Sequence, residues 1–357
     1  MLNQTRPDLN SDYPDKLLGK SSKPASRLGP PPGEPIGIAT NLIEAIARET
    51  SRWTRSGQAD VAAPDPRLRN IVRSKDTPAL FDWMIETFNF QGISDRVAAS
   101  YLQAHGSITW HQIKAQIGRD PACSLLRSYW AYEDCRYDKT RQACSHPRYL
   151  RGCPVPSHPL RNGRLNQTAF SFFLFVRDVA GSDLFRWLDD QLAAAADLGN
   201  SAAQEALVGP MRHVFGVSDK VLTMTLSAVL MADRRGRPDW FDVGSQMIVV
   251  DRLVHNLLAR AGILARSGAN HGYGQHCYGQ AGCADILRRV SAKIDARQFD
   301  AGFPANFPRY IQHALWHYCA ADGLNVCNGN NIDDRKSCEQ ISCMVYSICG
   351  QNALKIK

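Results

Sequence analysis

Apolar positions in this chain recur mostly at helical spacing. Apolar side chains dominate residues 165–179 and 184–198, and shorter amphipathic segments cover residues 38–52 and 79–88. No segment of useful length alternates between apolar and polar residues, as a half-buried strand would. The pattern therefore predicts an all-α fold.

Two further helices are expected to begin at similar short motifs. The segment from Gly92 to Ala98 (GISDRVA) closely repeats the segment from Gly216 to Leu222 (GVSDKVL). Serine is a favoured helix N-cap, so the two segments are either a repeated hairpin or a chance recurrence of one helix start. Two more helices are expected at residues 284–297 and 310–320.

Composition divides the chain into three parts. Residues 1–36 contain seven prolines, and residues 53–75 are again polar and contain proline. Such segments bury little apolar surface, which predicts a largely disordered tail over residues 1–76 with one possible helix. Residues 77–164 are expected to form an N-terminal helical extension with a cysteine-rich loop, and residues 165–357 the main helical domain.

Charge and cysteine content narrow the class of protein. The 357-residue chain has a formal charge of +8, which is compatible with binding nucleic acid. No uninterrupted apolar stretch approaches the length of a membrane span, and the polar, acid-containing start argues against a secretory signal. Eleven cysteines in groups favour metal sites in a reducing cytoplasm over a disulfide framework. A cytoplasmic protein is expected, associated with the nucleoid if the source is bacterial.

The segment from Phe215 to Thr225 (FGVSDKVLTMT) is the most informative motif. A glycine-containing turn that opens an apolar helix directs backbone N–H groups outward, where they and the helix dipole can bind phosphate. Gly216, Val217 and Ser218 are therefore candidate DNA-binding residues, and such contacts do not depend on base sequence. Lys220 would lie in the first turn of the helix, against the apolar interior. Burial disfavours the charged form of a lysine, so a neutral nucleophilic amine becomes available.

Asp251 follows within the apolar run from Met247 to Val254 (MIVVDRLV). Beside a nucleophilic lysine, its carboxylate could stabilise positive charge developing on a sugar, or help to deprotonate the amine. Each residue alone has a simpler interpretation, Lys220 as a solvated first-turn lysine and Asp251 as a buried helix cap. Their occurrence together favours the catalytic interpretation.

The hairpin, the lysine and the aspartate resemble the active site of the helix-hairpin-helix DNA glycosylases, the superfamily of endonuclease III and 8-oxoguanine glycosylase. The resemblance covers about residues 165–350 and implies a two-lobed helical fold. It also implies that Lys220 attacks C1′ of the nucleotide, expels the base and leaves a Schiff base, assisted by Asp251. The sequence departs from the family pattern at Phe215 (usually Pro), Ser218 (usually Gly) and Leu253 (commonly His), and in an extra charged stretch over residues 233–239.

Four cysteines near the C-terminus, Cys327, Cys338, Cys343 and Cys349, have the spacing C-x10-C-x4-C-x5-C. Four thiolates in one loop can bind an iron–sulfur cluster or zinc. The resemblance favours a [4Fe–4S] cluster, because endonuclease III-like proteins end in a helix, a glycine step and four such cysteines. Only the last spacing here agrees with the family, so an expanded loop is expected, and zinc or uncoordinated thiols remain the alternatives.

Two other groups of residues could bind metal. Cys135, Cys144 and Cys153 are evenly spaced, with His146 and His158 nearby, and could form a second site that holds structural zinc. A glycine-rich loop carries His271, His276, Cys277 and Cys283, which could bind a metal or belong to a flexible DNA-contacting loop.

The sequence thus predicts a monomeric DNA glycosylase with AP-lyase activity, acting on double-stranded DNA that contains a damaged or modified base. No membrane partner is expected. Two alternatives remain open. One is a non-catalytic helix-hairpin-helix DNA-binding module, and the other is an iron–sulfur protein with a redox or signalling role.

Overall fold

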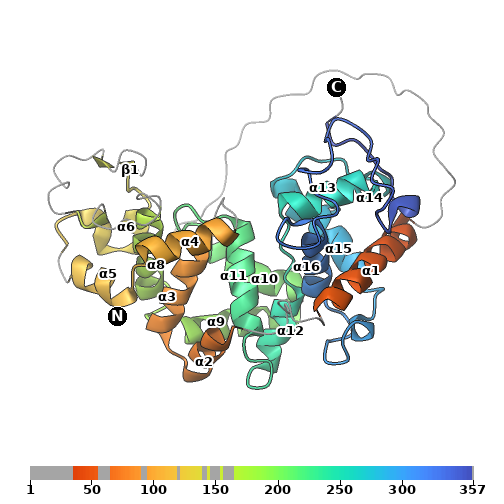
Figure 1. Ribbon diagram of the computed structural model, residues 1–357. Coiled ribbons are helices and arrows are strands. Elements are labelled where there is room, and N and C mark those ends of the chain that lie inside the picture. Colours follow the sequence, from red (N-terminus) through yellow and green to blue (C-terminus); the bar gives the residue numbers. More distant parts are fainter. Residues whose placement is uncertain are drawn as a thin grey trace, which may run out of the picture. The chain divides into compact units, whose positions relative to one another are not determined.

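The computed structural model describes residues 35–54, 65–89, 95–118, 121–138, 143–144, 153–155 and 165–355. These residues belong to one compact unit. This part of the chain is almost wholly helical, as the sequence predicts (Figure 1). The strands described there are two residues long, β1 (Tyr137–Asp138) and β2 (Ala143–Cys144), and they pair antiparallel. None of the described helices is long and apolar enough to cross a membrane.

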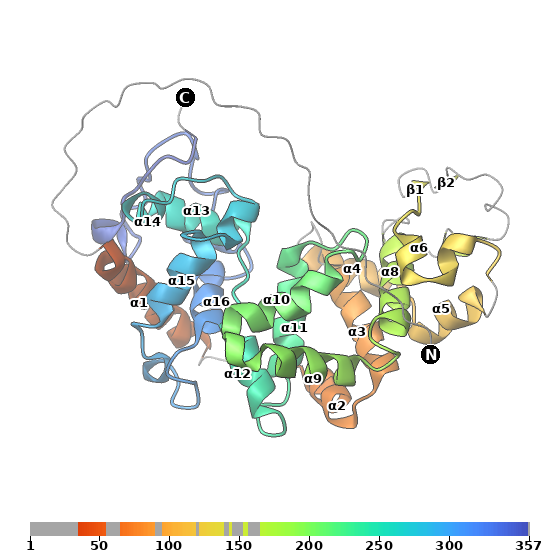
Figure 2. The same ribbon diagram turned by 180° about the vertical axis from the view of Figure 1, so that it is seen from behind.

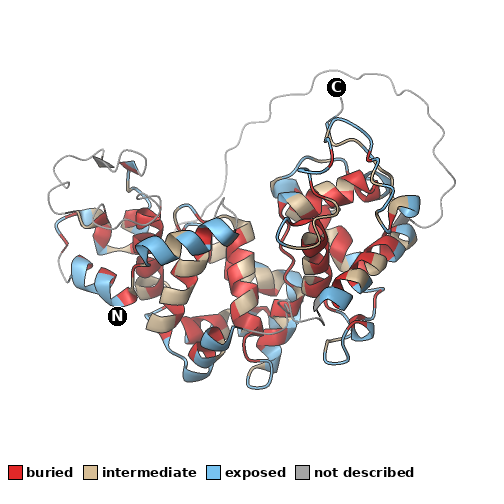
Figure 3. Ribbon diagram, viewed as in Figure 1, coloured by how far each residue is buried: buried red, intermediate tan, exposed pale blue. Residues whose placement is uncertain are grey.

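One hydrophobic core is built mainly on α8, because almost every side chain of this helix is buried (Figure 3). Phe172 of α8 stacks on Phe81 of α3, with ring centroids 5.1 Å apart. The elements of this half of the chain are α2 (Pro66–Ser74), α3 (Thr77–Phe88), α4 (Asp95–His105), α5 (Trp110–Ile117), η1 (Ser124–Arg127), α6 (Tyr129–Tyr132), α8 (Asn166–Asp178), α9 (Leu184–Ala195), η3 (Ala196–Leu198), α10 (Asn200–Met211) and α11 (Asp219–Met231).

A second hydrophobic core joins the first described helix to the C-terminal helices. Helix α1 packs against α15 and α16, and both views show it beside them (Figures 1 and 2). The elements of this half are α1 (Pro35–Thr54), α12 (Pro238–Gln246), α13 (Arg252–Arg260), α14 (Ile263–Arg266), η4 (Gln275–Tyr278), α15 (Cys283–Ser291), η5 (Ala296–Gln298), α16 (Pro308–Cys319) and η6 (Tyr346–Ile348).

The folded part of the chain begins earlier than the expected boundary near Thr77. Helix α1 buries Ala39, Leu42, Ile43 and Ile46, whose spacing forms one apolar stripe on a helix. Helix α2 also contributes buried side chains, to the first core. Neither core follows the expected division at residue 165, because side chains far apart in sequence share each one.

Two expected helices differ in extent. Helix α4 begins at Asp95, the position that corresponds to Asp219 at the start of α11, whereas residues 90–94 lie outside the described part. The helix expected over residues 284–297 ends at Ser291. Asp295 then caps a separate short helix by accepting a hydrogen bond from the backbone N–H of Arg297, at 3.0 Å.

Gly244 allows α12 to pack closely on α11. A Cβ atom at this position would lie 2.8 Å from Cβ of Leu230 and 3.1 Å from the carbonyl oxygen of Ser227. We expect Gly244→Ala to lower the free energy of unfolding by about 1–3 kcal/mol, because the two helices would have to separate. Urea denaturation measures this change.

The matched control is Gly37→Ala in α1, where an added Cβ meets no atom within 4 Å. There alanine should leave stability unchanged or raise it by up to about 1 kcal/mol, because it restricts the unfolded chain. Equal effects of the two substitutions would contradict close packing at Gly244.

Candidate functional site

Helices α10 and α11, joined by residues 212–218, lie where the sequence predicts a helix-hairpin-helix. The two helices pack against each other, and Gly216 in the connecting turn has φ +74°, a conformation that favours glycine. Ser218 has φ −86° and ψ 157°, values that any residue adopts, and it occupies the N-cap position of α11. The turn therefore requires a glycine at residue 216 and accepts a serine at residue 218, where the family usually has glycine.

Side chains of α8 hold the hairpin in place. The Thr168 hydroxyl donates to the carbonyl oxygen of Phe215 at 2.6 Å, and the Phe215 N–H donates to the Ser171 hydroxyl at 3.2 Å. The Phe215 ring also packs edge-on against Tyr132, which accounts for an aromatic residue in place of proline. Val217, a predicted DNA-binding residue, has a side chain buried in the first core, so it can contribute only backbone groups to a ligand.

Lys220 is the second residue of α11 and lines a cavity of about 700 Å³. Its lining also includes Ser218 and Asp219, and residues 273–275, 278 and 279 of a glycine-rich loop. Arg212, also in the lining, donates hydrogen bonds to Glu205 and, at 2.9 Å, to Asp219, and these bonds raise the pKa of its guanidinium. The hairpin lysine thus faces a cavity that also has aromatic side chains in its lining.

Asp251 is the N-cap of α13. Residues 247–250 precede it without helical structure, so the apolar residues before Asp251 lead into the helix and are not part of it. Its carboxylate accepts a hydrogen bond from the backbone N–H of Val254 at 2.9 Å, and 9% of the residue is exposed. The capping interpretation of Asp251 is therefore correct, and it does not exclude a catalytic role.

Two tyrosines in the lining of the cavity interact with Asp251 or with the residue before it. Burial, then the charge of Asp251, raises the pKa of Tyr273, which lines the cavity. The hydroxyl of Tyr278, also in the wall, donates to the carbonyl oxygen of Val250 and accepts from its N–H, both at 3.1 Å. Burial lowers the pKa of the Arg309 guanidinium to about 10, and attraction by Tyr278 and Asp251 opposes this. Asp251 does not line the cavity, but its charge acts on a residue that does.

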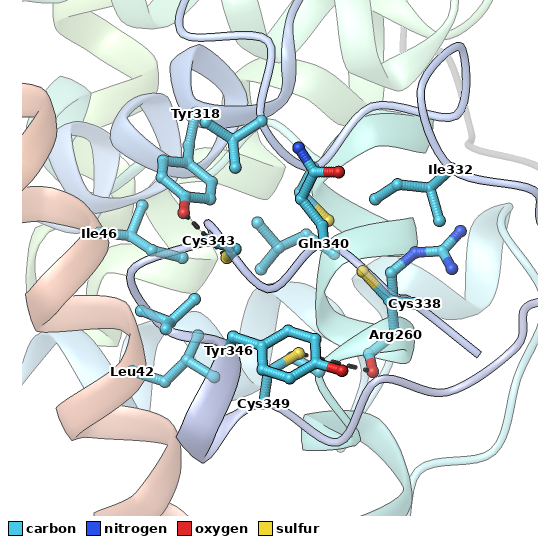
Figure 4. Close-up of a pocket in the computed structure, with 15 residues that line it drawn as sticks. Leu42, Ile46, Arg260, Tyr318, Ile332, Cys338, Gln340, Cys343, Tyr346 and Cys349 are labelled. Atoms are coloured by element: carbon cyan, nitrogen blue, oxygen red, sulfur yellow. Dashed lines mark hydrogen bonds between the residues drawn. The ribbon is translucent and has the colours of Figure 1, made fainter.

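The four C-terminal cysteines, Cys327, Cys338, Cys343 and Cys349, line a second, mainly apolar cavity. In Figure 4 the sulfur atoms of Cys338, Cys343 and Cys349 are turned toward one another across this space. Burial, then the negative charge of the three other thiols, raises the pKa of Cys349. Cys349 therefore interacts electrostatically with each of the three cysteines predicted to bind the same group.

Hydrogen bonds attach this cysteine loop to the second core. The N–H of Gly350 donates to the carbonyl oxygen of Ala261 at 3.0 Å, and the Tyr318 hydroxyl contacts the Cys343 sulfur at 3.2 Å. Arg260, with 3% of its side chain exposed, forms an ion pair with Asp334 of the loop at 2.8 Å. Apart from η6, residues 320–355 form no helix or strand, so these contacts and the cysteines position the loop.

A different group of side chains has the geometry of a single metal ion. The ligand atoms of His255, His271, Cys277 and Cys283 all lie within 4.8 Å of one another. In the part of the chain that the structure describes, no other group of three or more such ligands is so close, the C-terminal cysteines included. This His/Cys cluster can bind a metal ion.

One of the four ligands expected in the glycine-rich loop is different in the structure. His276 is exposed, and His255 on α13 takes its place. Two features of the sequence could have indicated His255: it lies on the apolar face of its helix, and it follows Asp251 by four residues, one helical turn.

A fourth cysteine, Cys123, lies near the evenly spaced Cys135, Cys144 and Cys153. The thiol of Cys153, whose pKa burial raises to about 11, interacts electrostatically with Cys123, Cys135 and Cys144. Cys123 was not part of the expected set. His146 and His158, which were expected nearby, lie outside the described residues.

Comparisons of the chain with models of protein families, with characterised proteins and with solved structures gave no match. The assignment of function therefore depends on the residues and on their geometry.

Proposed function

We propose that this protein is a DNA glycosylase with AP-lyase activity, which uses Lys220 as its nucleophile and Asp251 as its charged assistant. The observation that carries the proposal is the position of Lys220, in the first turn of the hairpin helix and facing a cavity. A volume of about 700 Å³ suits one extruded nucleotide, within the range of small-molecule sites. Tyr273 and Tyr278 in its wall provide aromatic surface on which a flipped base can stack.

The chemistry requires an amine, a carboxylate and a bound phosphate backbone. The neutral amine of Lys220 attacks C1′, the N-glycosidic bond breaks, and the base leaves with the bonding electrons and takes up the proton that the amine loses. The C1′–O4′ bond then breaks and opens the sugar ring, which gives a Schiff base. This Schiff base permits β-elimination, which cleaves the strand on the 3′ side of the sugar. Asp251 is buried, and a buried carboxylate stabilises the positive charge on the sugar more strongly than a solvated one would.

Backbone N–H groups at the start of α11 would bind a phosphate of the DNA backbone near the lesion, assisted by the helix dipole. Arg252, exposed and 5.7 Å from the centre of the Tyr273 ring, adds positive charge beside the cavity. The hairpin backbone and Arg252 would contact the DNA without reading its bases. Specificity for the target base would therefore come from the ease of its extrusion and from its fit in the cavity.

The C-terminal cysteines fit a [4Fe–4S] cluster better than a single ion. Thiolates that share one zinc lie about 3.8 Å apart, as tetrahedral bonds of about 2.3 Å require. The four thiols surround one cavity without meeting the spacing of a single ion, and the lining is mainly apolar. Cys327, Cys338, Cys343 and Cys349 would hold the cluster, which supplies a rigid, redox-active crosslink for the loop.

An assay of base release tests the proposed activity. Duplex oligonucleotides that each contain one oxidised, alkylated, deaminated or mismatched base are incubated with the protein, and free base and strand cleavage are measured. The proposal requires release of at least one modified base. Binding without release across all lesion classes would favour the non-catalytic DNA-binding module.

A matched pair of substitutions tests phosphate binding at the hairpin. Ser218→Asp and Ser218→Asn both keep a favourable N-cap, so both should fold. We expect Ser218→Asp to weaken binding to undamaged duplexes of every sequence about equally, because its carboxylate repels phosphate, whereas Ser218→Asn should retain it. Fluorescence anisotropy over a series of salt concentrations measures both variants.

The affinity of the protein without substitutions for DNA should itself fall steeply as the salt concentration rises, because binding releases counterions from the phosphates. Binding that is independent of salt, or equal binding by the two Ser218 variants, would contradict a phosphate-binding hairpin.

A further inference from the structure

We infer that His255, His271, Cys277 and Cys283 form a structural Zn²⁺ site that fixes the wall of the Lys220 cavity. Zinc binding itself does not depend on the proposed base excision, whereas its effect on a nucleotide in the cavity rests on that proposal. This site is separate from the C-terminal cysteine loop.

The distances among the four side chains suit one tetrahedral ion. Nδ1 of His255 lies 3.4 Å from the Cys283 sulfur and 3.5 Å from the Cys277 sulfur. Nε2 of His271 lies 3.8 Å from the Cys283 sulfur. Two thiolates around zinc are separated by about 3.8 Å, and shorter Zn–N bonds bring a nitrogen and a sulfur slightly closer. The observed separations therefore need little rearrangement to place an ion between them.

The chemistry of the donors selects zinc. Two sulfurs and two imidazole nitrogens are a common set for structural zinc, and thiolates disfavour magnesium or calcium. Nδ1 of His271 lies 2.9 Å from the carbonyl oxygen of Gly272, so a proton on Nδ1 would leave Nε2 free to bind the metal.

Burial also favours a closed, structural site. Cys277 and Cys283 are fully buried, and His255 is 6% exposed. All four ligands come from protein, which leaves no coordination position for substrate in a tetrahedral ion. The site would stabilise the fold and would not activate water.

The position of the site links it to the cavity. Cys277 lies within η4, and its neighbours Gln275 and Tyr278 line the Lys220 cavity. His255 belongs to α13, one turn after Asp251 at the N-cap. A metal at this site would therefore connect the helix that carries Asp251 to the loop that faces Lys220. The zinc would thus add a crosslink to a loop that contains four glycines (residues 272, 274, 279 and 282).

Metal analysis of the full-length protein tests the inference without DNA. After dialysis against a weak chelator, we expect one zinc per chain, in addition to any iron. His271→Ala, at a half-exposed ligand, should lower zinc affinity at least about 100-fold, as loss of a direct ligand should exceed loss of an outer-shell partner. His271→Cys should restore it. The matched control, His276→Ala, changes the exposed histidine of the same loop and should retain zinc.

Cobalt substitution and hydrogen exchange complete the test. Co²⁺ bound in place of zinc should give the intense visible bands of a tetrahedral ion with thiolate ligands. Removing zinc should accelerate hydrogen exchange in residues 268–282 while the first core remains protected. The inference is overturned if the protein contains no zinc, if His271→Ala binds it as tightly as His276→Ala, or if Cys277 and Cys283 form a disulfide. Absence of base release would leave these results unaffected, and would count only against the proposed function.

Discussion

Replacing Asp251 with asparagine should reduce base release by about 10²–10³-fold, the effect of removing one preorganised electrostatic group. Asparagine is also a good N-cap, so its side-chain oxygen can still accept the hydrogen bond from Val254 N–H. DNA binding and thermal stability should therefore change little. Single-turnover kinetics with saturating protein separate the chemical step from binding.

Two companion variants sharpen this prediction. Asp219→Asn removes the carboxylate that lines the cavity and pairs with Arg212, and it should reduce the rate much less than Asp251→Asn. Asp251→Ala should additionally lose about 1 kcal/mol of stability, because the cap is removed. A larger loss of rate in Asp219→Asn would assign the catalytic carboxylate to Asp219 and contradict the role of Asp251.

The second large effect is expected at the C-terminal cysteines. Protein purified without oxygen should be brown and contain about four irons per chain. Cys343→Ser should lose most of this iron, because serine is a poor replacement for a thiolate ligand. Residues 320–355 have little secondary structure, so they should then become sensitive to proteolysis. Iron analysis, the visible spectrum and limited proteolysis measure these changes.

Cys319→Ala is the matched control for the cluster. Cys319 is fully buried and interacts with Cys327, but it does not line the cysteine cavity. Its removal should leave the iron content unchanged. A colourless protein that contains only zinc, or loss of iron in Cys319→Ala and not in Cys343→Ser, would contradict the proposed ligand set.

The helices were predictable because their signals are local. The apolar runs of α8 and α9 are continuous in sequence, and Gly216 and Ser218 mark the start of α11. The extent of the folded part was not predictable in the same way. Helix α1 is stabilised by packing on α15 and α16, more than 200 residues later, and nothing local in the proline-rich N-terminal segment indicates that contact.

Metal ligands show the same contrast. Cys327, Cys338, Cys343 and Cys349 could be grouped from spacing alone, because they belong to one loop. His255 was missed because it reaches Cys277 and Cys283 from another helix, and the sequence pointed instead to the adjacent His276.

Covalent trapping with borohydride tests the central claim most directly. Duplex DNA that contains an abasic site, or a modified base that the protein releases, is incubated with the protein and borohydride. Borohydride reduces the Schiff base between protein and DNA to a stable amine. We expect a DNA–protein adduct with the unmodified protein and with Lys293→Ala, which changes an exposed lysine outside the cavity. Lys220→Ala should form none while still binding the DNA, and peptide mapping should place the adduct on Lys220. An adduct that persists undiminished in Lys220→Ala would contradict Lys220 as the nucleophile.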